Sequence, residues 1–510
     1  MVSKGSLSRM VQAARGAWER QEFHEYFETM ERACRLDPAN HTLLMDLGTA
    51  YGMRHNYPAA ERCYEKAVRV TPQRATTLAM VGTQCRNFSR HELARVYFER
   101  AIAERDAPAD TFVKLAELYE RFHFLEQAGQ LVERALQMDA DCALALLAHA
   151  RLERTRGNLD QAESIVRPLL QDKCSETWST RIRGWYELGA ILDRQRRYDE
   201  AMAAFLEAKT MIRPNAANYL ASQRQVHTRL QEAVANISAD VLRRWFESPP
   251  GGPPPQRLAL LCGHPRSGTT LLEQVLDAHP DIISAEETSV FFESYLSLKR
   301  GLPNDALLLT VLENAAPAAL AQEREYYFNS LDQFLGIPSR DRLLIDKNPS
   351  LTGLVPGFVR VLPEAKFLVA LRDPRDICLS CFMQPLPLNQ VSAMFLSLEG
   401  AVDEYVSLMG LWQAMRSRLP TPWLEVRYED LVEDLEAVSR RVLQFLGAPW
   451  NQEVLRFNEH ARKKLVRSPT YQDVTRPVTK GAVGRWRHYE KHLAPYLHKL
   501  APFVQGFGYE

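Results

Sequence analysis

A repeating pattern of small, aromatic and proline residues constrains the first part of this chain more than any other feature. Within residues 41–74 these residues stand at fixed positions: Gly48, Tyr51, Ala60, Tyr64, Ala67 and Pro72. Small residues let two helices approach closely, and a proline ends a helix because it lacks a backbone N–H. The aromatic Tyr64 is expected to fill the gap between neighbouring units. The unit therefore predicts a pair of antiparallel helices.

The same pattern recurs along most of the segment 1–215. The further units are 7–40 (degenerate), 75–108, 109–142, 143–176 and, after a short insertion, 182–215. Units of equal length with this pattern resemble the tetratricopeptide repeat. About six such units bury a continuous core, so we expect an all-α solenoid over residues 1–225. Its groove favours a peptide or protein partner; a spacer or a dimerisation platform is the alternative.

The segment Ser248–Pro255 holds five prolines in eight residues and marks a boundary. We expect a closing helix and a Pro/Gly linker over 226–256 and a second domain over 257–510. In that domain four short apolar runs alternate with helical patterns: 258–262, 343–345, 367–371 and 424–426. Such alternation predicts an α/β fold with a central parallel sheet. Ligands of such sheets bind at the carboxyl ends of the strands.

The residues after the first predicted strand indicate an anion-binding loop. Gly263 and Gly268 frame a short loop that leads into a helix. In this layout backbone N–H groups and a helix N-terminus converge on an anion. A nucleoside-triphosphate P-loop would carry Lys at position 269, where this chain has Thr, and its cation is instead Arg266 inside the loop. We therefore expect a P-loop-like site for a phosphate-like group, and a nucleotide kinase is disfavoured.

Polar residues also follow the helix after this loop and the next two apolar runs. Of the adjacent Glu286 and Glu287, one could face the cavity as a base and the other solvent, or the pair could begin the next helix. Lys347 could present its ammonium to the same cavity or lie on the surface. Arg372 and Ser380 are eight residues apart and could hold one phosphate if the chain reverses between them.

Two further stretches are candidates for ligand contact. Tyr428 follows the fourth run and could pack on a flat ring. Residues 480–487 combine three cations, two glycines and Trp486. This stretch could close over an anionic ligand with Trp486 as its anchor, or form a solvated basic turn.

Composition excludes several classes of function. The 63 basic and 63 acidic residues give a formal net charge of zero, so we expect no nucleic-acid partner. Neither a signal peptide nor a long apolar run is present, which predicts a cytoplasmic protein with no membrane span. The eight cysteines are scattered, and the Cys378–Cys381 pair has no second ligand pair nearby, so we expect no metal site.

Together these motifs resemble the PAPS-dependent sulfotransferases, whose sulfate donor is 3′-phosphoadenosine 5′-phosphosulfate. Six consecutive residues resemble the 5′-phosphosulfate loop of that family: Pro265, Arg266, Ser267, Gly268, Thr269 and Thr270. The segment from Arg372 to Ser380 resembles its 3′-phosphate site. The run 276–280 followed by Glu-Glu-Thr is most similar to the tyrosylprotein sulfotransferases, and the layout with repeats is similar to bacterial tetratricopeptide-repeat sulfotransferases.

The resemblance implies roles for individual residues. Glu287 matches the catalytic base, and Arg266 and Lys347 match cations beside the transferring group. Thr470 stands where the family has a catalytic Ser. The remaining implied nucleotide contacts are Tyr428 at the adenine, Arg485 in place of a phosphate-binding Lys, and the loop residues Lys480 and Gly481.

The resemblance also implies the reaction. It is transfer of the sulfuryl group of PAPS to an acceptor hydroxyl, on a peptide or protein and tyrosine-like, without a metal. Sulfation of a carbohydrate, lipid or small metabolite is one alternative, and a non-catalytic scaffold with a nucleotide-binding domain is another. An oligomer is compatible with the sequence.

Overall fold

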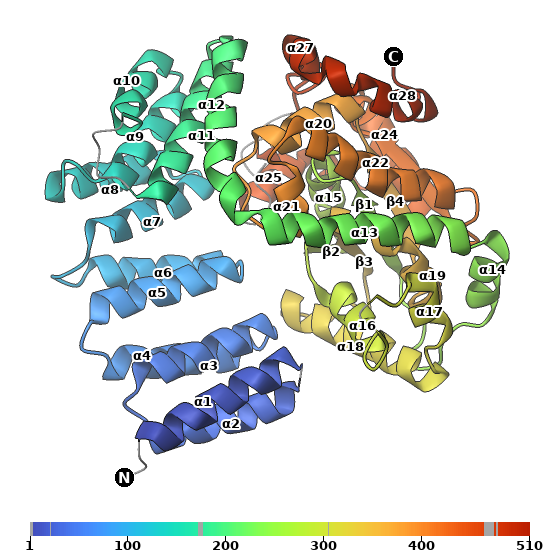
Figure 1. Ribbon diagram of the computed structural model, residues 1–510, viewed down its shortest axis with the longest axis horizontal. Coiled ribbons are helices and arrows are strands. Elements are labelled where there is room, and N and C mark those ends of the chain that lie inside the picture. The colour runs from blue at the N-terminus through green and yellow to red at the C-terminus, as the bar shows by residue number, and fades with distance from the viewer. Residues whose placement is uncertain (1–3, 21, 172–176, 304, 464–473, 476–477) are drawn as a thin grey trace. The chain divides into compact units, whose positions relative to one another are not determined.

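The computed structural model describes residues 4–510 except for 21, 172–176, 304, 464–473 and 476–477. The chain forms two compact units, Met1–Leu152 and Glu153–Glu510. The described residues of the first unit are helical or lie in short turns, and the second unit continues the helical repeats and then forms an α/β domain (Figure 1). The predicted fold class, an all-α repeat region followed by an α/β domain, is confirmed.

Successive helices pair across short turns in the repeat region. Their bounds are α1 (Lys4–Glu19), α2 (Phe23–Leu36), α3 (His41–Met53), α4 (Tyr57–Val70), α5 (Arg74–Asn87), α6 (His91–Ile102), α7 (Ala109–Arg121), α8 (Leu125–Met138), α9 (Ala143–Arg156), α10 (Leu159–Leu169), α11 (Trp178–Arg194) and α12 (Tyr198–Ile212). The turns inside four successive pairs each place one residue in the left-handed region, at the same position of the repeat: His55, Ser89, His123 and Gly157. The sequence period is therefore also a period of backbone conformation.

Glycines and aromatic residues at the repeat positions pack against each other. The pairs are Gly48 with Tyr64, Gly82 with Phe98, and Gly189 with Phe205. A Cβ atom added to these glycines would lie 2.5, 2.9 and 2.6 Å from the respective ring. No side chain fits at that distance, so the glycine is required for close helix packing. The aromatic fills space inside its own helix pair, whereas the sequence suggested the gap between neighbouring units.

The α/β domain contains a parallel five-stranded sheet in the order β2-β3-β1-β4-β5. The strands are β1 (Leu258–Gly263), β2 (Ile282–Glu286), β3 (Leu343–Lys347), β4 (Lys366–Leu371) and β5 (Trp423–Arg427). Four of them lie at the predicted apolar runs. The sequence missed β2 because only its first two residues, Ile282 and Ile283, are large and apolar.

Alternate residues of each strand face two different cores. Leu258, Leu260 and Cys262 of β1 join one core, and Ala259 and Leu261 join the other. Helices cover both faces of the sheet, as expected for a parallel sheet. The described α-helices that follow the repeats are α13 (Ala217–Asn236), α14 (Ala239–Glu247), α15 (Thr269–Asp277), α16 (Val290–Leu298), α17 (Leu308–Glu313), α18 (Pro317–Leu335), α19 (Val355–Val361), α20 (Pro374–Met383), α21 (Gln390–Met394), α22 (Leu398–Met415), α23 (Tyr428–Glu433), α24 (Leu435–Leu446), α25 (Phe457–Lys463), α27 (Glu490–Leu493) and α28 (Leu497–Gly506).

The two helices before the Pro/Gly linker pack on the α/β domain. In α13, which crosses one face in Figure 1, the Gln223 amide donates hydrogen bonds of 3.1 and 3.0 Å to the buried Glu404 carboxylate of α22. Trp245 of α14 is buried in the core on the same face. These helices therefore belong to the packing of the α/β domain as well as to the end of the repeats.

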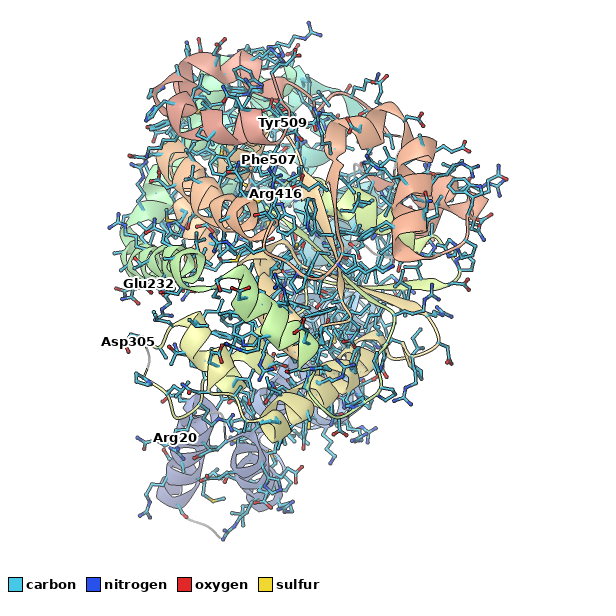
Figure 2. All side chains as sticks on the ribbon, turned by 90° about the vertical axis from the view of Figure 1, so that its right-hand side faces the viewer. Arg20, Glu232, Asp305, Arg416, Phe507 and Tyr509 are labelled. Atoms are coloured by element: carbon cyan, nitrogen blue, oxygen red, sulfur yellow. The ribbon has the colours of Figure 1, made fainter. Side chains whose placement is uncertain are left out.

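The end of the chain braces the start of α20. Arg416 lies over the ring of Phe507, 5.4 Å from its centroid, and both residues are labelled in Figure 2. The Tyr509 hydroxyl donates to Glu429 at 3.0 Å, and Glu429 accepts from the backbone N–H of Asp373 at 3.0 Å. Because Asp373 caps α20, these contacts help to fix that helix at the carboxyl edge of the sheet.

Candidate active site

The loop between β1 and α15 requires its two glycines. Gly263 has φ 140° and Gly268 has φ 95°, both in the region that side chains disfavour. A Cβ atom at Gly268 would also lie 2.7 Å from the ring of Tyr428. The loop therefore turns sharply and places the N-terminus of α15 at the carboxyl edge of the sheet. This is the geometry that binds anions.

Two expected site residues hold strained backbone. Among the described residues of 257–510, Arg266 and Glu287 are the two non-glycine residues with left-handed φ, at 73° and 52°. Such conformations cost on the order of 1–3 kcal/mol and gather at functional sites. Here they aim the two side chains from neighbouring loops.

A cavity of about 590 Å³ opens at the carboxyl ends of the strands. Segments after all five strands, together with the C-terminal part of the chain and one repeat helix, contribute to its wall. The lining side chains and glycines that matter for the chemistry are Pro265, Arg266, Gly268, Thr269, Thr270, Glu287, Asn348, Arg372, Asp376, Ser380, Tyr428, Gly481, Arg485 and Asp193.

The remaining expected site residues lie elsewhere. Ser267 is buried behind the loop, and Lys347 is buried beneath the cavity. The Lys480 side chain is exposed and pairs with Glu433. Thr470 lies outside the described residues. The structure therefore brings most of the expected donor residues together but places Lys480 apart from the cavity.

Lys347 is the centre of a buried charge cluster. Its Nζ lies 2.8 Å from Glu287, 3.3 Å from Glu286 and 3.5 Å from Glu273. Burial lowers the pKa of Lys347, but the carboxylates of Glu286, Glu273 and Glu287 outweigh it and raise that pKa above its usual value. The ammonium is therefore charged and engaged with carboxylates.

Both adjacent glutamates reach this ammonium, whereas the sequence suggested that only one of them would turn inward. Glu286 ends the buried strand β2, and the left-handed turn at Glu287 brings the next carboxylate to the same side. The side chain of Glu287 is 42% exposed and lines the cavity, while that of Glu286 is only 4% exposed. Glu287 is thus the carboxylate that a ligand in the cavity can reach.

Arginines form the opposite wall. Arg266 Nε donates to Ser380 Oγ at 3.1 Å, and Arg372 donates to the Arg266 carbonyl at 3.4 Å. The Arg372 guanidinium lies over the Tyr428 ring, 4.9 Å from its centroid. The turn at Pro374 brings Arg372 and Ser380 to the same cavity, which is the reversal that the sequence required.

A buried polar atom without a hydrogen-bond partner indicates whether this wall suits an anion. Within the described residues, Arg372 Nε is buried, has no hydrogen-bond partner and belongs to a side chain that lines the cavity. Leaving a buried donor unpaired costs about 1–3 kcal/mol. A phosphate group supplies acceptor oxygens for such a donor, so Arg372 fits a phosphorylated ligand.

Two aspartates at the site were missed by the sequence reasoning. Asp376 of α20 accepts the backbone N–H groups of Gly484 at 2.7 Å and Trp486 at 2.8 Å, which fixes the loop that carries Arg485. Asp193 of α11 lies 2.6 Å from Arg485. Asp376 follows Arg372 closely in the chain and could have been included with it, but nothing local to Asp193 indicates a site.

A further buried carboxylate, that of Asp346, lies next to the cluster. Burial raises the pKa of Asp346 to about 7, although the Tyr327 hydroxyl, which donates to it at 2.9 Å, and Lys347 both oppose that rise. This group makes stability depend on pH near neutrality.

Neither a metal site nor a membrane segment is found where the chain is described. No group of three or more His, Cys, Asp or Glu side chains among those residues could hold a metal ion. No described helix is both long enough and apolar enough to cross a membrane.

Comparison with known proteins agrees with this geometry. Residues 259–452 match the family model described as Sulfotransferase family, and residues 182–215 match that of the tetratricopeptide repeat. An uncharacterized protein of Aquifex aeolicus is 24% identical over 398 residues, which cover 76% of this chain and 50% of the relative.

Two animal proteins match the α/β domain. Protein-tyrosine sulfotransferase A of Caenorhabditis elegans is 26% identical over 49% of this chain and 66% of its own length. Protein-tyrosine sulfotransferase 1 of Danio rerio is 28% identical over 45% of this chain and 65% of its own length. The chain thus spans between half and about two thirds of these relatives. It carries a segment similar to the tetratricopeptide repeat, residues 182–215, and a segment similar to the sulfotransferase family, residues 259–452.

Proposed function

We propose that this protein transfers the sulfuryl group of PAPS to an acceptor hydroxyl, and that the acceptor is a tyrosine-like hydroxyl of a peptide or protein. The observation that carries the proposal is the shared cavity. It is lined by a helix N-terminus with Arg266, by a second basic site at Arg372 and Ser380, and by the carboxylate of Glu287.

The donor would lie along the basic wall. The backbone N–H groups of residues 268–270 and the Arg266 side chain suit the phosphosulfate, and Arg372 with Ser380 suits the 3′-phosphate. Tyr428 packs against Gly268 and lines the cavity, and its ring would contact the adenine. Gly481 and Arg485 close the wall from the C-terminal side. This arrangement recognises two separate phosphates, which distinguishes the donor from a nucleoside triphosphate.

Glu287 would act as the base. Its carboxylate would take the proton of the acceptor hydroxyl while that oxygen forms a bond to sulfur and the bond from sulfur to the phosphate oxygen breaks. The leaving group is adenosine 3′,5′-bisphosphate. A positioned base contributes roughly 10²–10⁴ in rate. Arg266 and the loop N–H groups would stabilise charge on the sulfuryl and phosphate oxygens, where one such donor is worth roughly 3–4 kcal/mol.

Lys347 would position this base. It holds Glu287 Oε1 at 2.8 Å and has no exposed surface, so it reaches the reacting atoms through Glu287. The resemblance places a cation at this position, and its burial supports a positioning role for it.

The repeats would hold the acceptor or a protein that carries it. The repeat architecture supports this, because the concave face of such arrays commonly binds peptides. The two animal relatives also support it, because both are named protein-tyrosine sulfotransferases. The experiment below distinguishes a protein acceptor from a carbohydrate, lipid or small-metabolite acceptor.

The test uses the full chain, radiolabelled PAPS and a cell lysate. Protease-sensitive labelled product supports a protein acceptor, and glycosidase-sensitive product rejects it. Glu287→Gln should lower transfer by roughly 10²–10⁴ while adenosine 3′,5′-bisphosphate still binds. Glu436→Gln is the matched control, because Glu436 pairs with Arg440 on the surface of α24. Full activity in Glu287→Gln would reject the base. Wild-type protein that binds ATP with magnesium but ignores the bisphosphate would reject the whole assignment.

A further inference from the structure

A repeat helix reaches the cavity of the α/β domain. Asp193 lies near the end of α11, inside the segment 182–215 that matches a tetratricopeptide repeat. Its side chain is 15% exposed and lines the cavity together with Arg485. The repeat region therefore supplies a carboxylate to the site in which the donor is proposed to bind.

Both oxygens of this carboxylate are engaged by one short segment. Asp193 Oδ2 lies 2.6 Å from Arg485 Nη2, and the Tyr489 hydroxyl donates to Asp193 Oδ1 at 2.6 Å. Arg485 and Tyr489 are the first and last residues of the 3₁₀ helix Arg485–Tyr489. Asp376 holds the start of the same helix through the N–H groups of Gly484 and Trp486. The segment that carries Arg485 is thus fixed from α20 and from α11.

Neighbouring contacts join the adjacent helix α12 to the same C-terminal part of the chain, away from the cavity. Tyr198 of α12 stacks on His488 with ring centroids 4.4 Å apart, and Asp199 pairs with Lys491 at 2.6 Å. None of these four residues lines the cavity. They provide a comparison, because they share the structural contact but not the access to ligand.

We propose that Asp193 is a positioning residue for the donor, which holds the Arg485 guanidinium at the cavity wall for a donor phosphate. The proposal rests on the proposed function. Arginine carries five N–H donors in a rigid fork, so a carboxylate can hold one side of it while other donors remain for a phosphate. An arginine already held in place loses less side-chain freedom when the ligand binds. Asp193 would therefore raise donor affinity through Arg485.

The test measures adenosine 3′,5′-bisphosphate binding to the full chain by calorimetry. Asp193→Asn keeps an acceptor for Tyr489 but removes the charge, and its Kd should rise about tenfold. Asp199→Asn removes the matched surface charge and should change the Kd less than about twofold. In an Arg485→Ala background, Asp193→Asn should have no further effect, because its action passes through Arg485.

Each outcome is decisive. Wild-type-like or tighter binding by Asp193→Asn overturns the proposal, and so does an equal loss in the Arg485→Ala background. Failure of the wild type to bind the bisphosphate overturns the proposed function itself. If thermal unfolding shows that Asp193→Asn is not folded, Asp193→Ala and Asp193→Glu replace it. The glutamate variant keeps the charge and should bind more tightly than the alanine variant, and equal binding by the two would overturn the proposal.

Discussion

Replacing Lys347 with methionine should destabilise the α/β domain and make its stability depend on pH. The Lys347 side chain has no exposed surface, and neither does that of Glu273, while that of Glu286 is 4% exposed. Methionine fills a similar volume, so the packing is nearly kept while the cation is removed. The buried carboxylates of Glu273 and Glu286 then lose the cation that they share.

The expected loss is about 3–5 kcal/mol at pH 8, the usual effect of removing one partner from a buried ion pair. Without the cation, burial and mutual repulsion raise the folded-state pKa values of Glu273 and Glu286 above their unfolded values. The folded state of the variant then binds more protons than the unfolded state. Its stability is recovered as the pH falls towards 5 and lost as the pH rises.

Urea unfolding followed by tryptophan fluorescence, at several pH values between 5 and 8, measures both effects. Lys499→Met is the matched control, because Lys499 pairs with Asp403 at 2.7 Å while both side chains are at least one third exposed. It should cost less than about 1 kcal/mol at any of these pH values. Adding Glu286→Gln to Lys347→Met should restore part of the lost stability.

Equal effects of Lys347→Met and Lys499→Met would refute the reasoning. A pH-independent loss in Lys347→Met would also refute it, because the loss would then come from packing rather than from removal of the cation beside the carboxylates.

Three further variants test other parts of the structure. Gly268→Ala should lower both stability and adenosine 3′,5′-bisphosphate affinity, because Gly268 has φ 95° and an added Cβ would lie 2.7 Å from the Tyr428 ring. The control Gly410→Ala in α22, where the nearest atom is 3.9 Å from the added Cβ, should be neutral or stabilising by up to about 1 kcal/mol. Calorimetry and urea unfolding compare the two variants, and equal effects would contradict the loop geometry. Asp346→Asn should flatten the pH dependence of stability between about pH 4 and pH 7. Folding raises the pKa of Asp346 to about 7, so the wild type loses stability as the pH rises through that window. An unchanged slope in the variant would contradict a raised pKa at Asp346. Arg372→Ala should weaken adenosine 3′,5′-bisphosphate binding at least tenfold by calorimetry and change adenosine 5′-monophosphate binding much less, and equal losses would argue against a 3′-phosphate site.

Local patterns were sufficient for much of this fold. Glycine and aromatic residues at fixed positions were sufficient to predict the repeats, because most contacts within a helix pair join residues that are close in sequence. Four strands were evident as apolar runs. The strand β2 was missed because it combines two isoleucines with a polar end, Ser284 to Glu286, whose burial depends on Lys347 of another strand.

The sequence alone determined which functional groups are available to the site. They are a glycine loop with an internal arginine, a pair of glutamates, and a second basic segment from Arg372 to Ser380. Tertiary structure decided how these groups are used. It buried Lys347 among three carboxylates, turned both glutamates to one side, and brought Asp193 of a repeat helix to Arg485, which lies far away along the chain. The physical reason is that charge pairing and burial depend on distances across the sheet and between helices, and residue spacing along the chain does not fix those distances.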